Sequence, residues 1–394
     1  MILRKYFSYA FIALLFLVSC SKKSGINLPE LPGRGGSGGG GSTPSIEAID
    51  TEIESFMKRF NVPGGSVAIT KNGKLVYAKG YGYADKENDQ KVDTSSLFRI
   101  ASLSKFITSL GIMKLVEAGK LNMNDKVFGP GAILGTEYGT EPYGPYVKDI
   151  TLRNVLQHEI GGWNNSNSDP AFQNPSMTRK QLISWTIDNR PLTAPPGTKL
   201  DYSNLGYFIL GEIIEKLSGK PYETYIREEI FEPAGVKNMS IAGGSLAERK
   251  KNEVKYYGQG ANAYGYSAGV ISRLGPCGGW IGSPIDYLRI LVRADGFATV
   301  PDMLQPSTIS IMSTSSPNSV YGCGIRVNSA GNWWHGGGLT GTRTWMVRAA
   351  NGFCWALFFN SKPSDETQFV TELDKLVWTA VKNMGTPWPN ADYF

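Results

Sequence analysis

One serine of this chain is placed so that a nearby lysine could make it a nucleophile. The pattern Ser-x-x-Lys occurs at Ser19, Ser55 and Ser102, so the pattern alone is weak. Ser102 differs because a helix-periodic apolar stretch follows it, which predicts a position near a helix N-terminus. Lys105 would then lie on the same helix face, and the positive helix end would favour both an alkoxide and a less charged lysine. The alternative is a capping serine beside a surface lysine.

A second candidate nucleophile is Ser267, which lies in a Gly-x-Ser-x-Gly pattern with His335 downstream. In α/β-hydrolases this serine sits on a sharp turn between a buried strand and a helix. The residues before and after Ser267 indicate neither element. An α/β-hydrolase that uses Ser267 is therefore the less favoured alternative.

The composition limits what other chemistry is available. The 394 residues include only two histidines, His158 and His335, and four cysteines, which argues against a His-rich metal centre or a zinc module. We expect no metal and no cofactor. The formal charge of +6 is spread without a basic block, so nucleic-acid binding is not indicated. We expect His158 to have a structural role.

Three short motifs follow one another in the order found in a known family. They are Ser102-Leu103-Ser104-Lys105, Tyr202-Ser203-Asn204 and His335-Gly336-Gly337. Tyr202 begins the only Tyr-x-Asn of the chain and His335 the only His-x-Gly, so the joint match is far more specific than Ser-x-x-Lys. Over about residues 45–385 the chain resembles the serine β-lactamase and penicillin-binding-protein superfamily, especially class C-like β-lactamases, DD-peptidases and related esterases.

The resemblance implies a role for each motif. Ser102 would attack a carbonyl group and form an acyl-enzyme, while Lys105 and Tyr202 would share the proton transfers. Tyrosine has an ordinary pKa of about 10, so it needs the positive charge that Lys105 supplies. The N–H groups of Ser102 and Gly338 would form the oxyanion hole. The residues that would orient the substrate are Asn204, His335, Gly337 and Gly338.

Gly336 departs from the pattern of the family. Relatives usually carry Thr or Ser there, and this hydroxyl helps to hold the carboxylate of penicillins or of peptide C-termini. Its absence weakens the case for β-lactam and carboxypeptidase activity and leaves room for an esterase or another amidase. Simpler interpretations also stay open, because Tyr202 and Asn204 could form only a capped helix turn and His335 could be a structural hydrogen-bonding residue.

The elements that must position these residues come from both ends of the chain. Asn72-Gly73 and Asn351-Gly352 each separate two β-rich runs, which is typical of hairpins. Helical patterns occur at 45–60, 102–118, 151–158, 179–188, 204–217, 222–230 and 366–384. These patterns predict an α+β fold: an antiparallel sheet built from both chain ends and flanked by helices, with a mainly helical inserted subdomain. The α/β part would cover about 44–100 and 275–394, and the helical part about 101–274.

The first residues are typical of an export signal. Arg4 and Lys5 precede an apolar run over 6–18 that is too short to cross a bilayer. The run ends in Leu17-Val18-Ser19-Cys20, which resembles the lipobox of bacterial lipoproteins and implies a signal peptide over 1–19 and a lipid on Cys20. The location would be the bacterial cell envelope, at the outer membrane or the periplasmic face. The alternative is an ordinary signal whose cysteine is accidental.

A tether and three further cysteines complete the prediction for the envelope. Residues 20–43 are polar and Gly-rich, so they form a flexible tether ahead of a domain over 44–394. Without Cys20 an odd number of cysteines remains, so at most one disulfide can form among them. Cys323 and Cys354 would be the pair, or all three, Cys277 included, are buried free thiols.

The sequence therefore predicts a lipid-anchored serine hydrolase that acts through a Ser102 acyl-enzyme. Its substrate would be an ester or an amide, namely a β-lactam, a D-amino peptide or a carboxylic ester, of small-molecule or cell-wall origin. The membrane would be its other partner, through the lipid, and the oligomeric state is left open. Two further hypotheses remain: a penicillin-recognising or cell-wall-binding lipoprotein with little turnover, and a catalytically dead scaffold.

Overall fold

A computed structural model describes residues 43–166, 168–266, 268–383 and 387–394. The helices in these ranges are α1 (Glu47–Arg59), α2 (Ser104–Glu117), α3 (Leu152–Leu156), α4 (Arg179–Asn189), α5 (Asn204–Ser218), α6 (Tyr222–Ile226), α7 (Ala268–Arg273), α8 (Pro284–Leu291), α9 (Pro306–Ser313) and α10 (Thr367–Asn383). The strands are β1 (Gly64–Lys71), β2 (Lys74–Asp85), β3 (Gln90–Lys91), β4 (Phe98–Arg99), β5 (Ser240–Ile241), β6 (Trp280–Gly282), β7 (Arg326–Val327), β8 (Trp333–Leu339), β9 (Thr342–Arg348) and β10 (Phe353–Phe359).

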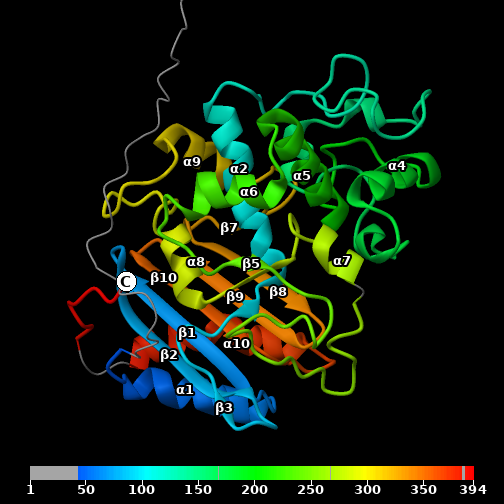
Figure 1. The fold of residues 1–394 in the computed structure, drawn as a ribbon. Helices are drawn as coiled ribbons and strands as arrows, with labels where there is room; N and C mark the ends of the chain where they lie inside the picture. Colours follow the sequence, from blue (N-terminus) through cyan, green and yellow to red (C-terminus); the bar gives the residue numbers. More distant parts are fainter. Residues whose placement is uncertain (1–42, 167, 267, 384–386) are drawn as a thin grey trace, which may run out of the picture.

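The main sheet joins the two ends of the chain (Figure 1). Within the described ranges it has seven strands in the order β3-β2-β1-β10-β9-β8-β7, all antiparallel. In the central pair β1–β10, Gly65 lies opposite Phe359 and Lys71 opposite Phe353. Strand β10 is buried along its whole length, which explains its continuous apolar sequence FCWALFF. The predicted α+β fold with a sheet built from both chain ends is confirmed.

The two predicted hairpins are present, with different turns. Asn72 and Gly73 both have positive φ, at 49° and 76°, as a two-residue type I′ turn requires. In the second hairpin only Gly352 has positive φ, at 90°. The N–H of Asn72 donates to the Gly352 carbonyl at 2.8 Å, so the two turns lie side by side.

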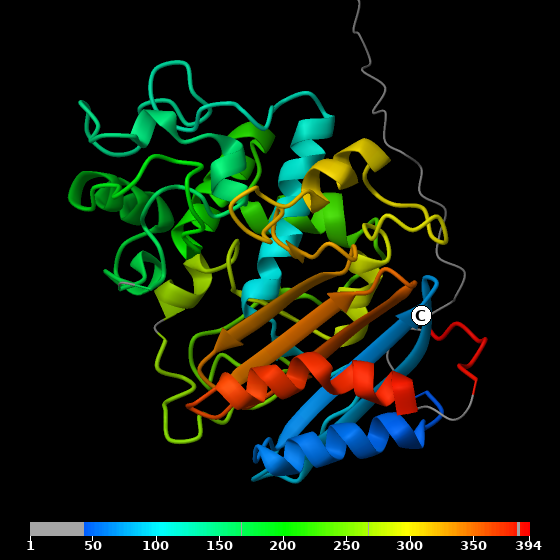
Figure 2. The same ribbon diagram turned by 180° about the vertical axis from the view of Figure 1, so that it is seen from behind.

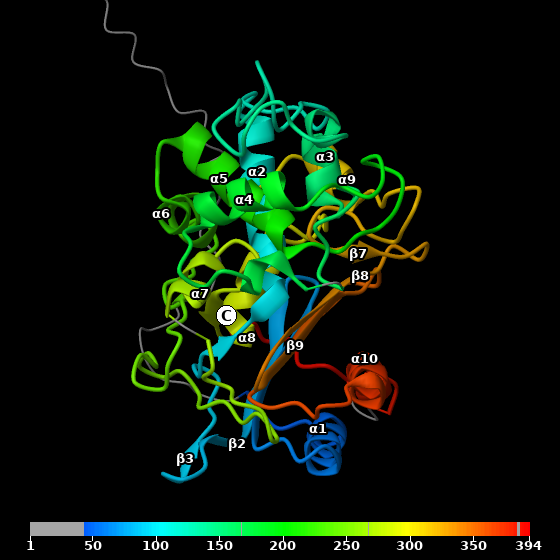
Figure 3. The same ribbon diagram turned by 90° about the vertical axis from the view of Figure 1, so that its right-hand side faces the viewer.

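Helices cover both faces of the sheet. Figure 2 shows α1 and α10 side by side on one face, and Phe56 of α1 meets Phe369 of α10 with ring centroids 4.9 Å apart. Seen edge-on in Figure 3, α2 and α8 lie on the opposite face, where the helical part begins. Because β1 and β10 have apolar layers on both sides, their register is fixed. Strand β8, which lies between β9 and the short edge strand β7, is held in place against the helical part.

The predicted helices of the middle segment are present, with three local differences. Ser102 lies in a 3₁₀ turn (Ala101–Leu103) that leads into α2, so it is placed just before the α-helix. Helix α6 ends at Ile226 and continues as a π-helical turn over Arg227–Phe231, where a longer α-helix was expected. A small sheet in the order β4-β6-β5 was not expected, because strands of two or three residues are too short to show a period.

Several sequence predictions fall outside the described residues. These are the signal peptide over 1–19, Cys20, all of the tether up to residue 42, and Ser267. Among the residues that the structure describes, no helix is both long and apolar enough to cross a bilayer. Cys277, Cys323 and Cys354 are buried and unpaired, so the disulfide between Cys323 and Cys354 is wrong and the alternative of free thiols is confirmed.

Candidate active site

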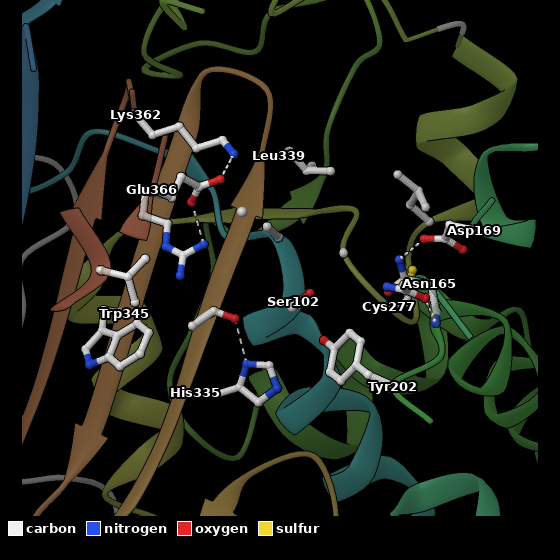
Figure 4. Close-up of a pocket in the computed structure, with 18 of the residues that line it drawn as sticks. Ser102, Asn165, Asp169, Tyr202, Cys277, His335, Leu339, Trp345, Lys362 and Glu366 are labelled. Atoms are coloured by element: carbon white, nitrogen blue, oxygen red, sulfur yellow. Dashed lines mark hydrogen bonds and ion pairs between the residues drawn. The ribbon is translucent and has the colours of Figure 1, made fainter. Parts of the chain in front are cut away.

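The predicted site residues gather around one pocket of about 480 Å³ between β8 and the helical part (Figure 4). Its lining includes most of the predicted site residues, namely Ser102, Tyr202, Asn204, His335 and Gly338, together with Gly336. Lys105 lies beneath the pocket and is completely buried. Gly337 faces the chain segment that precedes Ser102. The structure thus brings together residues that lie far apart in the sequence.

Ser102 is presented by a constrained turn. Ala101, just before it, has φ of 48°, a left-handed conformation that is unfavourable for a residue with a Cβ. Strand β9 holds this turn, because the Thr344 hydroxyl donates to the Ile100 carbonyl at 2.8 Å. Strain of this kind persists only where the surroundings enforce it, and it occurs most often at functional sites.

The Lys105 amine is fully engaged by three acceptors. Its Nζ lies 3.0 Å from Ser102 Oγ, 2.7 Å from Asn204 Oδ1 and 2.8 Å from the Cys277 carbonyl oxygen. An ammonium group has three N–H donors, so each acceptor receives one. The geometry therefore fits a charged Lys105 that donates a hydrogen bond to the serine.

The orientation of the Asn204 side chain is fixed by a half-buried carboxylate. Asn204 Nδ2 donates to Asp169 Oδ2 at 2.6 Å, so the amide oxygen must face Lys105. Burial raises the pKa of the Asp169 carboxyl, while hydrogen bonds from the Ala171 N–H and from Asn204 oppose this rise. Asn204 is also held through its backbone N–H, which donates to Asn165 Oδ1 at 2.8 Å.

Tyr202 completes the reactive group. Figure 4 shows its hydroxyl directed toward Ser102. The Lys105 Nζ lies 4.9 Å from the centre of the Tyr202 ring. The next residue, Ser203, caps helix α5 by accepting the Gly206 N–H at 3.1 Å. The tyrosine is therefore anchored at the first turn of a buried helix.

Both ring nitrogens of His335 are engaged within the protein. Nδ1 lies 2.7 Å from the Gly336 carbonyl oxygen, which can only accept, so Nδ1 carries the proton. Nε2 then accepts the Tyr321 hydroxyl. Burial lowers the pKa of His335 to about 3, and the positive charge of Lys105 acts in the same direction. This geometry favours the structural hydrogen-bonding role for His335 over proton transfer.

The glycines of β8 allow three close approaches. A Cβ on Gly337 would lie 2.3 Å from the Ile100 carbonyl oxygen, so this strand can approach the nucleophile turn only without a side chain. A Cβ on Gly336 would lie 2.5 Å from the Trp345 ring and 3.3 Å from Arg343 Nη2. The hydroxyl residue that relatives carry at this position would thus collide with Trp345, which gives a physical reason for the departure at Gly336.

A charged group on the pocket wall was missed by the sequence reasoning. Arg343 Nη1 pairs with Glu366 Oε2 at 2.8 Å, and Lys362 also contacts Glu366 (Figure 4). Arg343 is part of β9 and lies beside the glycines of β8. Lys362 and Glu366 lie in the segment that precedes α10. Asp169 and Tyr321 were missed as well. No local pattern marks these residues, because their roles arise only from the pairing of distant segments.

Ser267, the alternative nucleophile, has only one of the two flanking elements of a nucleophile elbow in the described residues. Ser267 itself is outside the described residues, but its neighbours are not. Helix α7 begins at the next residue, so the expectation that no helix follows is wrong. Residues 258–266 contain no strand, so the buried strand that a nucleophile elbow requires is absent from that described stretch.

Comparison with known proteins agrees with this arrangement. A family model described as Beta-lactamase matches residues 49–377. The chain belongs to the beta-lactamase family. Membership of the beta-lactamase family supports a serine hydrolase of this superfamily, and it confirms the resemblance inferred from the three motifs.

Two curated relatives match about half of this beta-lactamase-family chain. Protein flp of Staphylococcus aureus (strain MW2) is 32% identical over 197 residues, which is 50% of this chain and 38% of the relative. Penicillin-binding protein 4* of Bacillus subtilis (strain 168) is 33% identical over 211 residues, 51% of this chain and 41% of the relative. The chain therefore spans about two fifths of the length of these relatives.

Solved structures share the fold. D-amino acid amidase from Ochrobactrum anthropi SV3 superposes with a TM-score of 0.69 at 24% identity, covering 86% of this chain and 99% of that one. The octameric penicillin-binding protein homologue from Pyrococcus abyssi gives a TM-score of 0.69 at 23% identity, covering 85% and 78%. FmtA from Staphylococcus aureus gives 0.68 at 22% identity, covering 90% and 94%. At these identities the likeness shows the fold of the beta-lactamase family and no more.

Proposed function

We propose that this protein is a serine hydrolase that cleaves an ester or an amide through an acyl-enzyme on Ser102. The observation that carries the proposal is the 3.0 Å hydrogen bond from the Lys105 ammonium to Ser102 Oγ, at the rim of a pocket. A buried cation with three acceptors beside an accessible serine is what an activated nucleophile needs. A serine with only a structural role would not require a buried cation beside it.

The hydrogen bonds also suggest the path of the proton. Because Lys105 donates to Ser102, the serine proton must leave toward another group, and Tyr202 is directed toward it. A Tyr202 phenolate, stabilised by the Lys105 charge, accepts that proton as Ser102 Oγ bonds to the carbonyl carbon. Tyr202 then passes the proton to the leaving alcohol or amine. In the second half of the reaction, a water molecule attacks the acyl-enzyme, and the same residues restore Ser102.

The pocket walls support the charged intermediate. The backbone N–H groups of Ser102 and Gly338 are the donors that we propose for the oxyanion, and both residues line the pocket. Such preorganised donors contribute about 3–4 kcal/mol each to the stability of the transition state. The lack of a side chain at Gly338 lets the carbonyl group approach the strand.

The substrate that we propose is a carboxylic ester or a D-amino amide in preference to a β-lactam. The hydroxyl that relatives place after the third-motif residue is absent, and Trp345 occupies the space beside Gly336. Two fold neighbours are a D-amino acid amidase and a penicillin-binding protein homologue, which is consistent with an acyl-transfer reaction. The substrate would enter along β8.

Intact-mass spectrometry across esters, D-amino amides and β-lactams tests the proposal. We expect a mass increase equal to the acyl group on the native protein, and none on Ser102→Ala. Lys105→Met, which removes the three hydrogen bonds of the amine, should slow adduct formation by about 10²–10⁴-fold. An adduct that forms and persists would indicate the alternative with little turnover. Absence of any adduct on Ser102 would overturn the proposal.

A further inference from the structure

The segment around Tyr202 is held by one residue that the mechanism does not use, His158. The His158 carbonyl accepts the Asp201 N–H at 2.7 Å, and its ring Nδ1 accepts the Ser203 N–H at 3.1 Å. The Tyr202 carbonyl in turn accepts the Asn165 N–H at 2.8 Å. The loop that begins at His158 therefore holds both polar groups of the peptide after Tyr202 and the N–H of the preceding residue, Asp201.

The imidazole ring also packs directly on the tyrosine. The ring centroids of His158 and Tyr202 lie 4.2 Å apart at 34°, and Tyr207 packs against the imidazole as well, with centroids 5.1 Å apart. Tyr321 meets it edge-on at 4.6 Å and 80°. His158 is completely buried, so the ring has no freedom to move away. Aromatic pairs in tilted and edge-on arrangements attract one another beyond the effect of burying their area.

The protonation state follows from the hydrogen bonds. Nδ1 accepts a backbone N–H, so the proton of the neutral ring is on Nε2. Nε2 is buried and has no hydrogen-bond partner among the described residues. Burial and the nearby Lys105 charge lower the pKa of His158 well below its ordinary value. The ring is therefore a neutral acceptor that adds no positive charge beside Lys105.

The backbone of His158 gives independent support. Its φ is 59°, in the left-handed region where Asn, Asp and His are the side chains most often tolerated. This position makes three demands together: a left-handed backbone, an acceptor one bond beyond Cγ, and a flat ring. Among the standard residues histidine alone meets all three.

We propose that His158 is the positioning residue of Tyr202, which it holds by a hydrogen bond on one side and a ring stack on the other so that the hydroxyl faces Ser102. This inference rests on the proposed function, because the position of Tyr202 matters only if Tyr202 moves the serine proton. His158 itself touches neither Ser102 nor the reacting carbonyl. It acts through Tyr202.

Two variants of His158 separate its hydrogen bond with the Ser203 N–H from its ring packing on Tyr202. His158→Asn keeps an acceptor at the Nδ1 position and tolerates the left-handed backbone, but it lacks the ring. His158→Phe keeps the ring and leaves the buried Ser203 N–H without its acceptor. The matched control is Tyr207→Phe, which alters another ring packed on the imidazole and removes a buried hydroxyl that donates to the Leu156 carbonyl.

The readouts are the maximal rate of Ser102 labelling, the half-saturating concentration of the labelling ester, and a crystal structure of His158→Asn. We expect the maximal rate to fall by about 10²-fold in both variants, because a displacement of about 1 Å costs that much. The half-saturating concentration should change little, and Tyr207→Phe should label at the native rate. In the crystal structure the Tyr202 hydroxyl should have turned away from Ser102.

These measurements distinguish failure of the positioning role of His158 from failure of the proposed function. If folded His158→Asn labels at the native rate with Tyr202 unmoved, the positioning role is overturned. If the native protein forms no adduct, the proposed function fails, and the crystal structure alone still decides whether His158 positions Tyr202. If both His158 variants lose stability and rate only to the extent that Tyr207→Phe does, His158 is merely a packing residue and the proposal also falls.

Discussion

Both histidines of the chain are buried, and their partners keep both rings neutral. His335 is protonated on Nδ1, which faces the Gly336 carbonyl, and His158 is protonated on Nε2 because its Nδ1 accepts the Ser203 N–H. The two rings therefore have opposite tautomers within one site. His335 has both ring nitrogens engaged, and the unpartnered ring nitrogen of His158 already carries the proton, so proton transfer is left to the lysine and the tyrosine.

Because His335 is buried in its neutral form, the free energy of unfolding depends on pH. The folded pKa of His335 is about 3, below the value near 6.5 of an exposed histidine. Below about pH 6.5 the unfolded chain therefore binds a proton that the folded protein does not, and stability falls as the pH falls toward 3. We expect the free energy of unfolding of the native protein, relative to that of His335→Gln, to decrease by about 1.4 kcal/mol per pH unit between pH 6 and pH 4.

Urea unfolding of both proteins at several pH values measures this difference. His158 has the same sign of dependence, but it is present in both proteins and cancels. The carboxyls of Asp295 and Asp302, whose pKa values burial raises to about 7 and about 6, have the opposite sign and cancel as well. A difference that stays constant across this range would contradict the buried, neutral state of His335.

At the scale of single residues, the structure brings together the residues that the motifs singled out. Ser102, Lys105, Tyr202 and Asn204 lie close to one another because short motifs encode local positions at the N-terminal ends of helices α2 and α5. Asp169 and Tyr321 could not be predicted in the same way. Each acts by contacting a residue from a distant segment, and neither contact leaves a pattern in the neighbouring sequence. The Cys277 acceptor is a backbone carbonyl, which no side-chain motif reports.

Among the elements, β8 is the one whose position depends most on a missing side chain. Gly337 lets this strand approach the Ile100–Ala101 backbone, and Ala101 already has a left-handed conformation there. Gly337→Ala would place a Cβ 2.3 Å from both the Ile100 carbonyl oxygen and Thr344 Oγ1. We expect a loss of about 1–3 kcal/mol in stability, because the Ile100 backbone and the Thr344 side chain must both move.

The rate of adduct formation on Ser102 should also decrease in Gly337→Ala, since the same movement displaces the nucleophile turn. Thermal unfolding and intact-mass labelling measure the two effects. Gly144→Ala is the matched control, because a Cβ there meets nothing within 4 Å and its φ is not left-handed. Native labelling by a folded Gly337→Ala protein would show that the spacing of β8 is not critical.

The elements themselves were predictable in proportion to their length. Helices with an apolar stripe, such as α1 and α10, and hairpins with an Asn-Gly turn follow from local periodicity and turn chemistry. The sheet β4-β6-β5 does not, because two or three residues carry no period and their pairing is decided by tertiary packing. The π-helical turn after α6 has the same explanation, since only the tertiary context distinguishes it from a continued α-helix.

For the whole molecule we propose attachment to the membrane through a lipid on Cys20. The prediction is that Cys20→Ser moves the protein from the membrane fraction to the soluble fraction, because the lipid would be its attachment. Cell fractionation with immunoblotting measures this. Cys277→Ser, which changes a buried thiol, should stay with the membrane. A native protein that fractionates as soluble would refute the anchor.

The pairing of β1 with β10 also sets the order in which the molecule can be assembled. A ribosome releases Ser102, Lys105, Tyr202 and His335 before it has made β9 and β10, yet Thr344 of β9 holds the turn that presents the serine. Contacts between such distant segments form slowly and late. An interrupted chain that ends after β8 would therefore carry every motif of the site and still lack the scaffold of the nucleophile. We therefore expect acylation of Ser102 only in chains whose synthesis has passed β9 and β10.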